Sequence, residues 1–165
     1  MEKEERGKEI QVVIFKLGEE EFGGDIFQIR EIIRVPEITP VPQAPDFVEG
    51  MINLRGQVLA VIDLAKRFGM KGEREQSKDS RIIVVELDDN LLGMIVDAVP
   101  EVLRVPEDKI ESTPEAITSQ VHRDFIKGIA NLEGRLIVIL DLNRILTFKE
   151  KESLSRTNIE KQDNL

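Results

Sequence analysis

Residues that could carry out catalysis are scarce in this chain of 165 residues. It contains no cysteine and one histidine, His122, so it offers neither a thiolate nucleophile nor a cysteine-ligated metal centre. A histidine without a serine or cysteine partner makes no recognisable catalytic triad. No phosphate-binding, hydrolase or zinc-protease motif occurs in the sequence. The sequence therefore predicts a protein that is not an enzyme and that uses no metal or cofactor.

Acidic side chains are the remaining candidates for metal binding or acid–base chemistry. Residues 19–21 and 88–90 carry oxygen ligands of the kind that calcium prefers, but their spacing fits no calcium loop. Both segments lie where a hairpin turn is expected, and turns favour short polar residues. Asp63 and Asp141 each precede a leucine at the start of a short amphipathic segment, where an aspartate caps a helix. We interpret all of these carboxylates as structural.

Charge and composition disfavour several classes of partner. The chain has 23 basic and 32 acidic residues, a formal net charge of −9, which opposes binding to nucleic acid or to anionic membranes. Phenylalanine, with seven copies, is the only aromatic residue. The first nine residues are charged rather than apolar, and no run approaches the length of a membrane span. We therefore expect a cytoplasmic protein that does not insert into a membrane and does not bind nucleic acid.

The chain contains an internal repeat, which determines how the rest of the sequence is interpreted. At an offset of 70 residues, Arg34-Val-Pro-Glu37 aligns with Arg104-Val-Pro-Glu107, and Gly23 aligns with Gly93. At an offset of 78 residues, Asn53-Leu-Arg-Gly56 aligns with Asn131-Leu-Glu-Gly134. Each half of the chain therefore encodes the same structural unit.

Each unit consists mainly of short β-strands. Apolar, β-branched runs bounded by turn residues predict strands at 10–17, 22–28, 49–54 and 57–62 in the first half, and at 81–87, 91–97, 127–132 and 135–140 in the second. A third apolar strand follows in each half. In the first half its apolar pattern extends over 26–33 and so overlaps the end of the preceding strand. Three prolines make 35–42 an irregular or edge segment. Short amphipathic segments follow at 63–68 and 141–148.

Five short strands in each half, with little helix, predict an all-β fold of two small barrels that share a core. We expect one domain over 10–150, with barrels at about 10–70 and 80–148 that could exchange strands. Residues 1–9 and 152–165 are expected to be flexible tails because of their composition.

Positions at which the two halves differ are the most informative about function. Arg55 stands where the second half has Glu133, so the turn tolerates either charge and an arginine is not required for folding. A guanidinium at this turn can contact a carboxylate on a partner. Strand alternation places Glu31 on the same face as Ile29 and Ile33. Glu31 either pairs with Arg55 within the molecule or marks the edge of an exposed apolar binding groove, and the sequence leaves these alternatives equal.

The order and spacing of these residues resemble the CheW family of bacterial chemotaxis coupling proteins. The resemblance rests on Gly50-Met-Ile-Asn-Leu-Arg-Gly56, the following Val58-Leu-Ala-Val-Ile-Asp-Leu64, and the preceding Glu31-Ile32 and Ile38-Thr-Pro-Val-Pro42. It runs from about residue 12 to residue 146. It implies two five-stranded SH3-like β-barrels packed on a shared hydrophobic core, with short helices.

The same resemblance implies a scaffold role without catalysis. Such proteins connect the cytoplasmic signalling tip of chemoreceptors to the regulatory domain of the histidine kinase CheA. The family's receptor contacts, together with the rest of the Asn-Leu-Arg-Gly motif, match Ile29, Glu31, Gly50, Asn53, Leu54, Arg55, Gly56, Gly93 and Val99. We expect these residues to bind partners.

Two other functions are kept as alternatives. One is a β-barrel that binds a small ligand or an oligonucleotide, which the negative charge and the shortage of stacking aromatics disfavour. The other is a CheW-like module that serves a different signalling pathway with the same fold.

Overall fold

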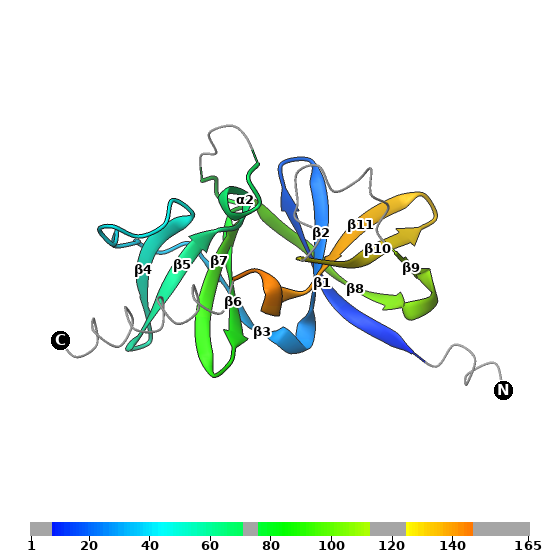
Figure 1. The fold of residues 1–165 in the computed structure, drawn as a ribbon, viewed down its shortest axis with the longest axis horizontal. Coiled ribbons are helices and arrows are strands. Elements are labelled where there is room, and N and C mark those ends of the chain that lie inside the picture. The colour runs from blue at the N-terminus through cyan, green and yellow to red at the C-terminus, as the bar shows by residue number, and fades with distance from the viewer. Residues whose placement is uncertain (1–7, 71–75, 113–124, 147–165) are drawn as a thin grey trace.

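The computed structural model describes residues 8–70, 76–112 and 125–146. In this part of the chain the secondary structure is almost entirely β, arranged as two curled sheets that lie side by side (Figure 1). The short helix α2, Leu64–Arg67, lies near their junction. The all-β fold with short helices that the sequence predicted is confirmed.

The strands fall close to the positions expected from the sequence. They are β1 (Glu9–Leu17), β2 (Glu20–Asp25), β3 (Ile29–Arg34), β4 (Val48–Leu54), β5 (Gln57–Asp63), β6 (Arg81–Leu87), β7 (Asn90–Val96), β8 (Ala98–Pro106), β9 (Ile110–Glu111), β10 (Ile126–Leu132) and β11 (Arg135–Leu140). Short 3₁₀ turns complete the set: η1 (Ile26–Gln28), η2 (Glu107–Lys109) and η5 (Leu142–Arg144). The segments expected to be tails lie almost wholly outside the described residues, and Glu9 already belongs to β1.

Each sheet combines strands from both repeats. Barrel A has the strand order β8-β1-β2-β11-β10-β9, and barrel B has the order β3-β6-β7-β5-β4. The first hairpin of each repeat, β1–β2 or β6–β7, is therefore built into the barrel that holds the later strands of the other repeat. Neither barrel is formed by residues 10–70 or by residues 80–148 alone, because the repeats exchange these hairpins reciprocally.

Each exchanged hairpin pairs with strands of the other repeat in the same way in both barrels. One strand pairs antiparallel, β1 with β8 and β6 with β3. The other pairs parallel, β2 with β11 and β7 with β5. Because both strands of each hairpin are held by main-chain hydrogen bonds to the other repeat, the two halves of the chain cannot separate without breaking these ladders.

Alternation along the strands divides the apolar side chains among three cores. In β7, Leu92, Met94 and Val96 face a large core that both barrels share, whereas Ile95 faces the interior of barrel B. Val12 and Ile14 of β1 belong to the smaller core inside barrel A. The shared hydrophobic core that the sequence predicted is therefore present, and it is the largest of the three.

Two local expectations need correction, and a third agrees with the structure. The strand expected at 22–28 ends at Asp25, because the Asp25 side chain accepts a hydrogen bond from the Phe27 amide and starts η1. Barrel A contains a sixth, two-residue strand, β9. The corresponding segment of the first half, 35–42, makes only the bridge between Thr39 and Met51, because its prolines lack the N–H groups that a longer ladder needs.

Candidate partner-binding site

Glu31 and Arg55 form a two-pronged ion pair on barrel B. Arg55 Nη1 donates to Glu31 Oε1 at 3.1 Å, and Arg55 Nη2 donates to Glu31 Oε2. This forked geometry fixes the orientation of both side chains. Of the two alternatives that the sequence left open, pairing within the molecule is the one observed. The Arg55 side chain nevertheless remains 70% exposed, against 28% for Glu31, so the guanidinium stays accessible to a partner.

The hairpin between β4 and β5 positions Arg55. Arg55 and Gly56 are its two turn residues, with φ of 51° and 88°, and the Asn53 side chain accepts a hydrogen bond from the Gly56 amide at 2.8 Å. Two consecutive positive φ values are typical of the tight turns that match strand twist. The equivalent Glu133 and Gly134 have φ of 54° and 91°, so both hairpins hold their turn in the same way.

The ion pair connects the two ends of the barrel B sheet. Glu31 lies on β3, which is one edge strand, and Arg55 follows β4, which is the other. The side chains therefore link edges that share no long main-chain ladder. The hydrogen bond from Arg55 lowers the pKa of the Glu31 carboxyl below its ordinary value, so Glu31 is charged at neutral pH.

Barrel A contains a related arrangement with the arginine at a different position. Arg135, the first residue of β11, contacts Glu21 at 2.9 and 2.7 Å and Glu101 at 2.7 Å. Glu101 is the repeat equivalent of Glu31, whereas Arg135 is equivalent to Gln57 rather than to Arg55. Hydrogen bonds from Arg135 also lower the pKa of the Glu21 carboxyl. The sequence analysis missed Arg135, although its place beside the Asn-Leu-X-Gly turn was a signal.

Ile29 and Val99 lie where the chain passes from one barrel to the other. Ile29 opens β3 after the chain leaves β2 of barrel A, and Val99 is near the start of β8 after the chain leaves β7 of barrel B. Both side chains are half-buried and pack against the shared core. These repeat equivalents therefore mark the two crossovers at the junction of the barrels.

The remaining candidate residues have mainly structural environments. A Cβ on Gly50, whose φ is 151°, would lie 2.2 Å from the Thr39 carbonyl oxygen, so this glycine allows the 35–42 segment to approach β4. Gly93 is buried, and a Cβ there would meet Ile82 and Val61 inside barrel B. Leu54 packs against the core of barrel B. The structure thus brings Glu31, Arg55 and the hairpin together, and it places Gly93 inside the barrel.

Arg67 is a further residue that the sequence analysis did not identify. Its guanidinium lies 5.0 Å from the ring centroids of both Phe47 and Phe125, and its Nε donates to the Ile145 carbonyl at 2.7 Å. Phe47 and Phe125 are repeat equivalents, and so are Arg67 and Ile145. Arg67 therefore contacts equivalent segments of the two repeats and connects them. A repeat alignment shows the arginine opposite an isoleucine, but not the contact.

Neither a metal site nor a membrane span was found among the described residues. No group of three or more metal-ligating side chains lies close enough together there to hold a metal ion. Likewise, no helix in that part of the chain has the length and apolar character to cross a bilayer. Asp63 and Asp141 cap α2 and η5 through their side chains, as predicted.

The chain is a double β-barrel with an exposed candidate arginine on a hairpin turn and half-buried candidate residues at the junction of the barrels. The model of the CheW-like domain family matches residues 11–150. This chain belongs to the CheW-like family.

Individual relatives are similar over most of their length. The chain is 37% identical to the chemotaxis protein CheW of Rhizobium meliloti over 143 residues, which cover 87% of this chain and 91% of that protein. It is 32% identical to the chemotaxis protein CheW of Treponema pallidum, covering 90% and 88% of the two chains. The crystal structure of the scaffolding protein TtCheW from Thermoanaerobacter tengcongensis superimposes with a TM-score of 0.78 at 43% identity, covering 87% and 91%.

Proposed function

We propose that this chain is a non-enzymatic scaffold that couples chemoreceptors to the histidine kinase CheA in the cytoplasm. Its membership of the CheW-like family and its similarity to a scaffolding protein and to proteins named as chemotaxis proteins support this role. The observation that carries the proposal is the Glu31–Arg55 pair, which holds an exposed guanidinium on a turn where the other repeat folds equally well with a glutamate.

The receptor is proposed to bind at the junction of the barrels. Its signalling tip is a helical hairpin, and a helix binds by burying an apolar stripe and contacting charged groups beside it. Ile29 and Val99 supply half-buried apolar side chains at the two crossovers, and Arg55 supplies the charge. A receptor carboxylate would compete with or extend the contact to Glu31.

The kinase regulatory domain is proposed to bind at a barrel edge. That domain is itself a similar double barrel, so two like surfaces can pack together. Ile32 on β3 and Val102 on β8 are repeat equivalents on terminal strands of their sheets, and their residues are 38% and 48% exposed. Exposed apolar side chains on edge strands are typical of surfaces that bind another sheet.

An oligonucleotide-binding barrel has little support. Binding single strands without a basic surface requires several exposed aromatic side chains on which bases can stack. Within the part of the chain that the structure describes, Phe27 is the only aromatic residue among the exposed large apolar side chains. Phe15, Phe22, Phe68 and Phe125 are all buried in the shared core.

A bridging assay tests the proposal. A chemoreceptor signalling-tip fragment is immobilised, and capture of the CheA regulatory domain is measured with and without this chain. The proposal predicts that the regulatory domain is retained only when the chain is present. Retention that does not depend on the chain, or no retention in its presence, would contradict a coupling role.

A further inference from the structure

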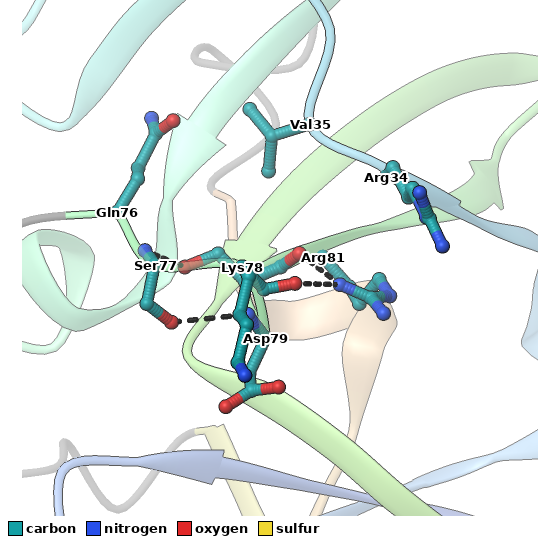
Figure 2. A pocket seen from close by; sticks show the side chains of 8 residues that line it. Arg34, Val35, Gln76, Ser77, Lys78, Asp79 and Arg81 are labelled. Carbon is teal, nitrogen blue, oxygen red and sulfur yellow. Dashed lines mark hydrogen bonds between the residues drawn. The ribbon is translucent and has the colours of Figure 1, made fainter.

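Two arginines face each other across neighbouring strands of barrel B. Arg34 ends β3 and Arg81 begins β6, and the two are direct partners in the β3–β6 register. Side chains at directly opposed positions project from the same face, and like charges at such positions destabilise a sheet. Figure 2 shows the two guanidinium groups on the same side of the ladder. This pairing needs an explanation in a chain with a net charge of −9.

The other repeat shows that the fold does not need the second arginine. Arg104 is equivalent to Arg34, and its register partner on β1 is Gln11, which is equivalent to Arg81. At the equivalent position barrel A folds with a neutral glutamine. The Arg34–Arg81 pair is therefore a difference between the repeats that places two like charges at directly opposed positions.

A surface cavity of about 670 Å³ adjoins the two arginines. Its lining includes Arg34, Arg81, Lys78 and Ser77, with Val35 as the one apolar side chain among the lining residues that the structure describes. The cavity is thus of ligand size but too polar to suit an apolar ligand. Three cationic groups lie around it against one carboxylate, that of Asp79.

Arg81 is held in place with most of its donors unused. Its Nη1 donates to the carbonyl oxygens of Lys78 at 2.7 Å and Ser80 at 2.8 Å, as the dashed lines in Figure 2 show. The segment before it is fixed by hydrogen bonds between Ser77 and Ser80. Among the described residues, neither Arg34 nor Arg81 makes an ion pair with Asp79 or another carboxylate. The remaining N–H groups of Arg81 are therefore available to a ligand.

We propose that this cavity binds a compact, multiply charged phosphate compound, such as a polyphosphate or a small organic phosphate. Two guanidinium groups on one face match phosphate oxygens through paired hydrogen bonds, and Lys78 adds a third positive charge. A single carboxylate would leave most of this charge uncompensated, and it would fill little of the cavity. Binding of the phosphate relieves the repulsion between Arg34 and Arg81, so the ligand stabilises barrel B.

Calorimetric titration of the full chain with tripolyphosphate, at low ionic strength and without divalent metal, tests the proposal. We expect binding to the wild type that weakens as salt is added. The Arg81→Gln variant copies the pair found in barrel A, so it should fold with an unchanged or higher melting temperature and bind at least about tenfold more weakly. Arg34→Gln, at an exposed position, should weaken binding similarly.

Arg104→Gln is the matched control, because it removes the equivalent arginine from the other barrel and should leave binding unchanged. Absence of tripolyphosphate binding to the wild type, or equal binding by wild type and Arg81→Gln, would overturn the proposal. Binding of a glutamate-rich peptide in the absence of tripolyphosphate binding would also overturn it, because the site would then recognise an acidic protein segment.

Discussion

Arg55 and Arg135 pair with glutamates at equivalent positions in the two barrels, although the arginines themselves are not equivalent. Arg55 contacts Glu31 from the turn of the β4–β5 hairpin, whereas Arg135 contacts Glu101 from the first residue of β11. At the turn of the second hairpin the chain carries Glu133 instead. Both barrels thus keep an ion pair to the strand that follows the crossover, but only barrel B displays its arginine at the tip of a turn.

The first prediction concerns the role of Arg55 in folding. Arg55→Glu should fold normally, because Glu133 adopts nearly the same positive φ at the equivalent turn. Exposed ion pairs contribute little to stability, so the melting temperature should stay within a few degrees of the wild-type value. Circular dichroism melting measures this. Loss of the folded state would show that Arg55 is needed for the structure rather than for binding.

A second prediction follows from the lowered pKa of Glu31. A carboxyl group whose pKa falls on folding stabilises the protein above its unfolded pKa, and this contribution is lost as the pH falls through the folded pKa. The stability difference between the wild type and Arg55→Gln should therefore be present at neutral pH and disappear in acid. Denaturant unfolding across pH measures the difference. Carbon NMR should also show a higher Glu31 pKa in the variant, and an unchanged pKa would contradict the role of the pair.

The third prediction concerns Asp63, the N-cap of α2. Burial raises the pKa of this carboxyl, which means that folding disfavours its charged form at neutral pH. Asp63→Asn keeps a good capping group without the charge, so it should be at least as stable as the wild type at pH 7. Asp63→Ala loses the hydrogen bond to the Lys66 amide and should cost about 1 kcal/mol in unfolding free energy. Equal stability of the two variants would show that the cap is unimportant.

Gly50 provides a fourth prediction. Gly50→Ala should reduce the unfolding free energy by more than about 2 kcal/mol, because the new Cβ would collide with the Thr39 carbonyl and break the bridge to Met51. Gly56→Ala is the control, since it also has a positive φ but no atom within 4 Å of the added Cβ, and it should cost only about 1 kcal/mol. A similar loss in both variants would mean that backbone strain, not the close approach, makes Gly50 necessary.

A fifth prediction concerns the contact between the repeats at Arg67. Arg67→Met keeps much of the side-chain bulk but loses the contacts with two rings and the hydrogen bond to Ile145, so it should cost about 1–3 kcal/mol. Arg30→Met removes only an exposed pair with Glu86 and should cost less than about 1 kcal/mol. Chemical denaturation compares the two variants, and equal costs would argue against a fastening role for Arg67.

Features that depend on nearby residues were predictable from the sequence. The hairpins were located because turn residues such as Gly18, Asp88 and Asn53 specify where a strand reverses. The caps at Asp63 and Asp141 followed from the same local chemistry. The repeat also identified Arg55 as a position where function, rather than folding, could select the residue.

Features that depend on contacts between the repeats could not be predicted in the same way. The hairpins β1–β2 and β6–β7 have similar apolar patterns, so either could complete either barrel, and the pattern does not reveal the exchange. The position of Arg67 between Phe47 and Phe125 arises only after both repeats are assembled. Gly93 was assigned to the binding surface by resemblance, whereas its burial inside barrel B results from strand alternation and register.

The central claim is that one surface of this chain binds a receptor while another binds the kinase. Calorimetric titration of the wild type, Arg55→Glu and Ile29→Asp against a receptor signalling-tip fragment, and separately against the CheA regulatory domain, tests it most directly. We predict that the wild type binds both partners and that the variants lose receptor binding but retain kinase binding. Failure of the folded wild type to bind either partner, or receptor binding that both variants retain in full, would contradict the claim.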